Sequence, residues 1–204
     1  NYRDLDQAIF QINQATDLDF VVNLGDMTNS AYNFEYNQFL DSIHALRWPL
    51  LSVLGNHDSI GAGPSLFRKM FGDSNFWFES ASRRFIFFNS NNLENPKEFD
   101  PDWLLAQVNS STKPVFIFSH VNLRDPERYF DNVATTFDTV IKHPKVQLIL
   151  NGHNHVWGLA TDNGTTMLEV PRVQGPAWII LEVQANQLDI LRMDKGSTTS
   201  VSLK

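Results

Sequence analysis

Four groups of polar residues with the chemistry of metal ligands each follow a short apolar run in this chain. Such runs are typical of buried strands, and packing alone gives no reason for a carboxylate, an amide or an imidazole at the end of each one. Oxygen and nitrogen donors in this mixture suit manganese, iron, cobalt or zinc. The pattern therefore predicts a metal site. The groups are Asp26 after FVVNLG, Asn56 and His57 after LLSVLG, His120 after PVFIFS, and His153 with His155 after VQLILNG.

Taken one at a time, these groups also have structural explanations. Gly25-Asp26 is compatible with an ordinary turn after a strand, and the residues from Gly55 onward also have turn composition. A lone His120 is compatible with a buried histidine whose hydrogen bonds are satisfied. The His153-x-His155 pair is the strongest single group, because Gly152 lets the backbone bend sharply in front of it. Only the combination of the four groups favours function over packing.

Composition limits the kinds of site and partner. The chain has 204 residues, compatible with one domain, and it has no cysteine, which excludes disulfides, thiolate metal sites and cysteine nucleophiles. Its formal net charge of −7 argues against a broad basic face for nucleic acid. No apolar run reaches the roughly 20 residues of a membrane-spanning helix. The sequence predicts a soluble domain and specifies neither its compartment nor its oligomeric state.

The segments between the polar groups alternate between helix and strand patterns. Apolar residues on one helix face predict helices at 5–15 and 34–46, and each is followed by an apolar run, at 19–24 and 50–54. This alternation predicts a parallel sheet with helices packed on it. Because the carboxyl ends of parallel strands meet at one edge, the polar groups are expected to converge there. Further helices are expected at 101–108 and 127–142, and further strands at 115–118 and 146–150.

The other segments are short and β-like. Two aromatic-rich stretches, 76–78 and 85–88, flank a polar turn and predict a hairpin. The C-terminal third is predicted to be mostly antiparallel sheet, and residues 196–204 are expected to be loosely held. Its strands are expected at 157–161, 165–170, 178–183 and 188–193, with turn residues between them.

The polar groups resemble the motifs of the calcineurin-like metallophosphoesterase family. The order of the motifs and their positions at strand ends match as well, and the resemblance covers about residues 5–183. It implies an α/β fold, a four-layer α/β/β/α sandwich with two mixed β-sheets flanked by helices, formed by one domain over 1–204. Residues 170–183 are also similar to phosphodiesterase-like bacterial members. The motifs are Gly25-Asp26, Gly55-Asn56-His57-Asp58, Ser119-His120 and Gly152-His153-Asn154-His155.

The resemblance also implies a set of metal ligands. Asp26 would bridge two metal ions. Asn56, His120 and His153 would complete one metal site, and His155 would belong to the other. Two ions of manganese, iron, zinc or cobalt would hold a bridging hydroxide and clamp a phosphate for in-line attack.

The implied activity is metal-dependent hydrolysis of a small phosphorylated substrate, by a phosphodiesterase or a phosphomonoesterase. His57 would contact the phosphate and protonate the leaving oxygen, and Asp58 would orient His57. Residues 25–30 read Gly-Asp-Met-Thr-Asn-Ser and lack the longer Gly-Asp-x-x-Asp-Arg-Gly pattern of the protein phosphatases. Arg124 and Arg128 could also hold the phosphate, although a solvated loop explains them more simply.

One motif of the family is missing from the sequence. An Asp-x-His at the end of the first strand normally supplies two ligands of the second metal, but only 25 residues precede Asp26 and none is histidine. The chain is either a non-catalytic or single-metal member that acts as a binding module, or a domain truncated before Asn1. We expect truncation, because losing a strand inside a sheet leaves backbone groups of its neighbours unpaired.

Overall fold

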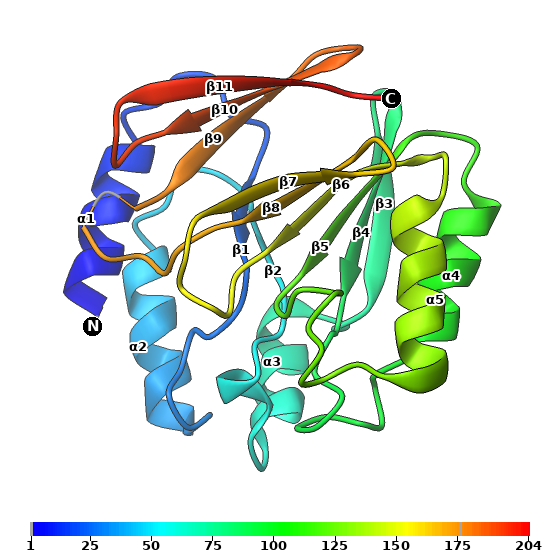
Figure 1. Ribbon diagram of the computed structural model, residues 1–204. Helices are drawn as coiled ribbons and strands as arrows, with labels where there is room; N and C mark the ends of the chain where they lie inside the picture. The colour runs from blue at the N-terminus through cyan, green and yellow to red at the C-terminus, as the bar shows by residue number, and fades with distance from the viewer. Residues whose placement is uncertain (1, 176) are drawn as a thin grey trace.

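The computed structural model describes residues 2–175 and 177–204 and has four layers, with two β layers between two layers of helices (Figure 1). Three helices cover one β layer, and two helices cover the other. The α/β/β/α order of layers that the resemblance implied is thereby confirmed. The helices are α1 (Tyr2–Ile12), α2 (Asn33–Ile43), α3 (Gly63–Phe71), α4 (Pro101–Ser110) and α5 (Asp131–Lys142).

One β layer is a six-stranded mixed sheet with the strand order β3-β4-β5-β6-β8-β7. Its four central strands are parallel, and an antiparallel strand lies at each edge. The loops after β5 and β6 therefore leave the sheet at the same edge. The strands are β3 (Phe76–Ser80), β4 (Arg83–Phe88), β5 (Val115–Ser119), β6 (Val146–Asn151), β7 (Gly158–Asp162) and β8 (Thr165–Glu169).

The other β layer consists of two hydrogen-bonded sheets. One is a parallel pair, β1 (Val21–Asn23) and β2 (Leu50–Ser52). The other is antiparallel, with the strand order β11-β10-β9. Its strands are β9 (Ile179–Val183), β10 (Gln187–Arg192) and β11 (Ser197–Ser202). Of the two mixed sheets that were expected, the six-stranded sheet is mixed. The second layer instead consists of a parallel pair and a separate antiparallel sheet.

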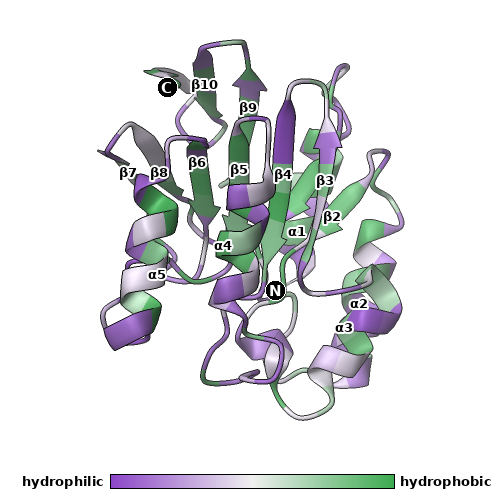
Figure 2. Ribbon diagram, turned by 90° about the vertical axis from the view of Figure 1, so that its right-hand side faces the viewer, coloured by the Kyte–Doolittle hydropathy of each residue, from purple (hydrophilic) through white to green (hydrophobic). Residues whose placement is uncertain are grey.

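An apolar core fills the space between the β layers. The ring of Phe87 stacks on Phe76, with centroids 4.5 Å apart, and on Phe118, with centroids 4.8 Å apart. Every residue of β5 and β6 is buried, because a second core against α4 and α5 covers their other face. Burial on both faces is why these strands read as continuous apolar runs, and both are coloured hydrophobic in Figure 2. A third core joins α1, α2 and α3.

Most of the expected elements are present with boundaries shifted by a few residues. The helix expected at 101–108 begins at Pro101, and the Asp100 side chain caps it by accepting a hydrogen bond from the backbone N–H of Trp103 at 2.8 Å. The helix expected at 127–142 begins only at Asp131. The carbonyl oxygen of Asp125 accepts a hydrogen bond from the backbone N–H of Tyr129 and closes a turn, and the backbone at Phe130 is extended. No helix among residues 2–175 and 177–204 has the length and apolar character needed to cross a bilayer.

Two segments differ from the expectation. Residues 196–204 are not loosely held, because β11 pairs with β10 along its whole length and Leu203 is buried in the core between the β layers. The sequence reading also missed α3. Its apolar residues, Leu66-Phe67 and Met70-Phe71, cover only two turns of helix. They also follow Gly63-Pro64, a pair typical of turns, which here forms the start of the helix.

Candidate metal centre

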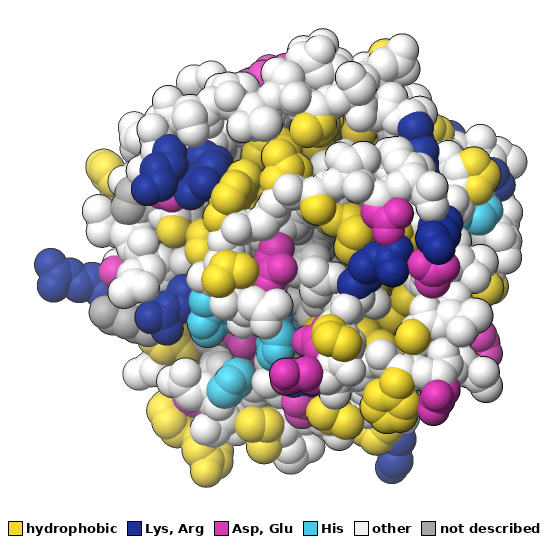
Figure 3. All heavy atoms as spheres, viewed as in Figure 1, with side chains coloured by type: hydrophobic (Ala, Val, Ile, Leu, Met, Phe, Trp, Pro, Cys, Tyr) yellow, Lys and Arg dark blue, Asp and Glu magenta, His cyan; other side chains and the backbone are white. Residues whose placement is uncertain are grey.

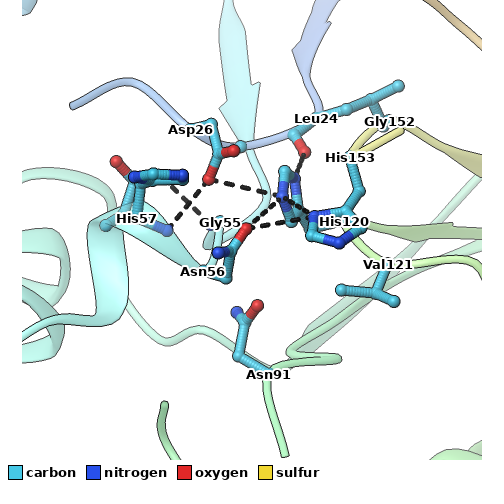
Figure 4. A network of polar contacts seen from close by, with 12 residues as sticks. Leu24, Asp26, Gly55, Asn56, His57, Asn91, His120, Val121, Gly152 and His153 are labelled. Carbon is cyan, nitrogen blue, oxygen red and sulfur yellow. Dashed lines mark hydrogen bonds and ion pairs between the residues drawn. The ribbon is translucent and has the colours of Figure 1, made fainter. Parts of the chain in front are cut away.

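The loops that follow β1, β2, β5 and β6 bring four of the expected ligands together (Figure 4). One ligand atom each from Asp26, His120 and His153 lies within 4.8 Å of the others. The Oδ1 atom of Asn56 lies 3.0 Å from Nε2 of His120 and 3.1 Å from Nδ1 of His153. Nε2 of His120 is 3.3 Å from Oδ1 of Asp26. The convergence that the strand ends predicted is therefore present for these four side chains.

This group has the donor atoms that a metal ion needs. Nδ1 of His120 lies 2.6 Å from the carbonyl oxygen of Leu24, which only accepts, so Nδ1 carries the hydrogen. When the ring is neutral, its Nε2 lone pair therefore faces Asp26 and Asn56. Acceptors in contact with one another require a proton or a cation between them. The four side chains offer nitrogen and oxygen ligands, one of them a carboxylate, and the carbonyl oxygen of Leu24 orients the His120 ring. This combination fits a divalent transition metal.

Three of the predicted ligands in these loops have backbone conformations that side chains disfavour. The φ angle is 57° at Asp26, 70° at His153 and 58° at His155. Such left-handed positions are uncommon for residues other than glycine, and each costs on the order of 1–3 kcal/mol. The surrounding structure holds them, which aims Asp26 and His153 at the same point.

Glycine is required where the loops after β1 and β2 touch. A Cβ on Gly55 would lie 2.1 Å from the backbone nitrogen of Asp26 and 2.3 Å from its Oδ1 atom. A Cβ on Gly25 would lie 2.7 Å from Cα of Gly55 and 2.7 Å from Nδ1 of His120. These glycines let the two backbones pack directly against each other, so Asn56 and Asp26 reach the same ion.

Asp58 lies beneath the site and is fully buried. Its carboxylate accepts hydrogen bonds from the backbone N–H groups of Met27, Thr28 and Gly55 at 2.9–3.2 Å, and from Oγ1 of Thr28 at 2.9 Å. Burial raises the pKa of Asp58 and the charge of Asp26 raises it further, against the lowering effect of these hydrogen bonds. The carboxylate thus joins the loop that carries Asp26 to the loop that carries Asn56.

His57 is held by a backbone oxygen. Its Nδ1 atom lies 2.7 Å from the carbonyl oxygen of Asn29, and its own backbone N–H donates to Oδ1 of Asp26 at 3.0 Å. No hydrogen bond joins the side chains of His57 and Asp58 within the described part of the chain, so the orienting contact that the resemblance implied for Asp58 is supplied by Asn29 instead. The exposed ring leaves Nε2 facing solvent.

A family model described as calcineurin-like phosphoesterase matches residues 1–157 of the sequence. The chain belongs to the calcineurin-like phosphoesterase family. It is accordingly a phosphoester hydrolase, and membership implies divalent metal ions at the site. The resemblance of its motifs to this family is confirmed. No curated protein matches the sequence of this phosphoesterase.

Solved structures share the fold of this phosphoesterase at low sequence identity. A dimetal phosphatase from Danio rerio has a TM-score of 0.80 at 15% identity, over 99% of this chain and 89% of that chain. A purple acid phosphatase from yellow lupin has a TM-score of 0.74 at 14% identity, over 98% of this chain and 48% of that chain. GAP50 of Plasmodium has a TM-score of 0.63 at 15% identity, over 100% of this chain and 83% of that chain.

His155 and the two loop arginines lie outside the ligand group of this phosphoesterase. His155 is exposed and is not among the residues that gather around Asp26. Arg124 forms ion pairs with Asp138 and Asp162. Arg128 is held by Glu94 through two hydrogen bonds of 2.9 and 3.1 Å. Both arginines are therefore engaged with carboxylates.

Asn91 is a supporting residue that the sequence reading missed. It is buried in the loop after β4, and its Nδ2 donates to the carbonyl oxygen of Leu54 at 2.7 Å, two residues before Asn56. Its Oδ1 has no hydrogen-bond partner among the described residues. The signal was present, because Asn89-Ser90-Asn91 follows the apolar stretch 85–88 just as the other polar groups follow theirs.

The protonation of the site follows from burial and from the charges within it. Burial lowers the pKa of His120, but the hydrogen bond and charge of Asp26 raise it, and the net direction is upward. Burial also lowers the pKa of His153, and His120 lowers it further. Burial raises the pKa of Asp26, but its hydrogen bond and charge interaction with His120 lower it, and the net direction is downward. Without a metal, these shifts therefore favour an ionised Asp26 paired with a protonated His120, and they disfavour a proton charge on His153.

Metal binding by this phosphoesterase is expected to release a proton from His120. Because the pKa of His120 is raised above 6.5, the ring is protonated at slightly acidic pH and loses its proton as pH rises through the raised value. Affinity for Mn²⁺ should thus increase with pH, with about one proton released per ion near pH 6.5. Calorimetric titration in two buffers of different ionisation enthalpy measures the proton count. An affinity that stays constant from about pH 5.5 to 8 would contradict this assignment.

Proposed function

We propose that this phosphoesterase hydrolyses small phosphoesters, as a phosphodiesterase or a phosphomonoesterase, at a dinuclear metal centre. The observation that carries the proposal is the convergence of possible ligand atoms of Asp26, Asn56, His120 and His153, with neighbouring atoms 3.0–3.3 Å apart. A cation satisfies all of them at once. The sequence of residues 25–30, which lacks the protein-phosphatase pattern, favours small substrates over phosphoproteins.

Each ligand has a proposed place in this centre. Asn56, His120 and His153 would hold one ion, Asp26 would be shared with a second, and His155 would help to hold the second. Bound manganese, iron, zinc or cobalt would polarise a phosphoryl oxygen and lower the pKa of the attacking water. The backbone at His155 has the same left-handed conformation as at His153, and its side chain is exposed.

His57 is the proposed proton donor to the leaving oxygen. The carbonyl oxygen of Asn29 accepts from Nδ1 of the ring and so fixes its orientation. This leaves Nε2 as the atom that faces substrate. The contact between the His57 backbone and Asp26 keeps the ring beside the metal ligands. A donor placed in this way neutralises an alkoxide as it leaves the phosphorus.

Replacing His57 by asparagine is expected to reduce hydrolysis according to the leaving group. Esters of alcohols should lose about 10²–10³-fold in kcat, because an alkoxide needs the proton. p-Nitrophenyl esters should lose only about tenfold or less, because p-nitrophenolate is stable as an anion. Steady-state kinetics on both ester types measures the difference. His44→Asn, at the exposed C-terminal end of α2, is the matched control, and equal losses on both ester types would remove His57 from this role.

The proposed function is tested most directly with bis-p-nitrophenyl phosphate and p-nitrophenyl phosphate. The metal-stripped protein should be inactive, and Mn²⁺ should restore turnover of one or both esters. His153→Ala should remain inactive at the same Mn²⁺ concentration, since it removes a ligand. Turnover by the stripped protein equal to that of the Mn²⁺-loaded protein would exclude a metal-dependent mechanism.

A second candidate is a single-metal or non-catalytic member of the family that acts as a binding module. It is favoured by one observation, which is that the group around Asp26 includes His120 and His153 but not His155. Mass spectrometry of the native protein separates the candidates. Two ions per chain with turnover support the dinuclear enzyme, whereas one ion without turnover supports the binding module.

A further inference from the structure

A pocket of ≈520 Å³ lies beside the loop that carries His153, and His155 of that loop forms part of its wall. His155 is two residues along the chain from the metal-group member His153, so the pocket wall and the candidate centre share the loop after β6. The other walls come from Trp157 just before β7, the loop after β8, and the end of β10 with the turn that follows it. In Figure 3, Lys and Arg side chains lie close to the histidines on the left of the visible face.

Charge in the pocket is predominantly positive. Arg172, Arg192 and Lys195 line it, with Asp194 as its carboxylate. This is unusual for a chain whose formal net charge is −7. The concentration of cations beside a metal centre makes the pocket a favourable place for an anion.

Arg192 is fixed in place by its neighbours. Its guanidinium carbon lies 4.2 Å from the ring centroid of Trp157, and Asp194 accepts from its Nε at 3.1 Å and from its Nη2 at 2.6 Å. Trp157 also lines the pocket. Arg192 and Asp194 therefore offset each other's charge and form a rigid floor. The remaining positive charge of the pocket comes from Arg172 and Lys195.

Arg172 has a defined orientation as well. The Oε1 atom of Gln174 accepts from its Nε at 3.3 Å and from its Nη2 at 3.2 Å. This contact is to a neutral amide, so the charge of the guanidinium is not offset there. Arg172 can still form charge-assisted hydrogen bonds to an incoming anion.

We infer that this pocket binds a second anionic group, a phosphate or a carboxylate, carried by the phosphoester whose reacting phosphoryl group lies at the metal centre. The inference rests on the proposed function for the position of the reacting group. Arg172 and Lys195 are the residues that recognise the second anion, and Arg192 on Trp157 shapes the floor. The substrate class is thus a phosphoester with two separated anionic groups.

The inference is tested with two ligands that differ in one group. Glycerol 3-phosphate ends in a hydroxymethyl group where 3-phosphoglycerate has a carboxylate. Inhibition of bis-p-nitrophenyl phosphate hydrolysis gives an inhibition constant for each. We expect 3-phosphoglycerate to bind at least about tenfold more tightly, as a charge-assisted hydrogen bond allows. The ratio should fall to about one in Lys195→Gln and Arg172→Gln. Lys195→Arg should keep the preference.

Calorimetric titration of the same ligands into metal-stripped protein separates this inference from the proposed function. If the reporter is not hydrolysed, the proposed function fails, and the titration alone decides the pocket. Lys69→Gln is the matched control, because Lys69 lies on α3, at the bottom of Figure 1 and far from the β10–β11 turn at the top. Equal affinity for the two ligands, or a preference that survives in both glutamine variants, overturns the inference.

Discussion

Replacing Asp26 by asparagine is expected to lower Mn²⁺ affinity by about 100-fold or more and hydrolysis of p-nitrophenyl esters by roughly 10³-fold. Asp26 is the carboxylate in the group with His120 and His153, so the variant removes its negative charge while keeping its shape. An amide oxygen binds a divalent ion far more weakly than a carboxylate. Calorimetry measures the affinity, and steady-state kinetics at saturating Mn²⁺ measures the activity.

The control for this variant is Asp6→Asn, an exposed change of the same kind on α1. It should leave both quantities unchanged. Circular dichroism should show that Asp26→Asn is folded, since the amide oxygen can still accept from the backbone N–H of His57. A folded Asp26→Asn protein with wild-type metal affinity would show that the ion binds elsewhere.

Replacing Asp58 by alanine is expected to destabilise the protein by about 3–5 kcal/mol. The change leaves the backbone N–H groups of Met27, Thr28 and Gly55 without their buried acceptor, and each unpaired donor costs about 1–3 kcal/mol. Relief of the repulsion between Asp58 and Asp26 offsets only part of this loss. Urea unfolding in the presence of a chelator measures the difference without a contribution from metal.

Two further variants make the Asp58 result specific. Asp41→Ala, on the exposed face of α2, should change stability by less than about 0.5 kcal/mol. Asp58→Asn should fall between wild type and alanine, because one oxygen remains to accept from the two loops. If Asp58→Ala unfolds at the same urea concentration as wild type, the carboxylate does not hold the loops together.

The sequence was sufficient for the layers and for the convergence of the site. Short apolar runs buried on both faces, such as β5 and β6, and helices with one apolar face between them leave few ways to pack. The rule that parallel strands end at one edge then places Asp26, Asn56, His120 and His153 together. Both inferences use only periodicity and chain order, which a single sequence contains.

Other features depend on contacts between distant residues and were not predictable in this way. The polar β11 becomes a strand because β10 offers a free edge and because Leu203 is buried between the layers. The resemblance to the family implied that Asp58 orients His57. The chain instead turns the carboxylate toward the backbone of Met27 and Thr28, which are 30 or more residues away.

The left-handed backbone at Asp26, His153 and His155 has a consequence for protein engineering. A designer who copied only the ligand side chains onto another scaffold would place them on ordinary backbone, where they aim in other directions. The transferable unit is larger and includes the two glycines that let the loops after β1 and β2 touch, together with the buried carboxylate beneath them. The centre is better regarded as a piece of backbone geometry that happens to carry ligands than as a list of ligands.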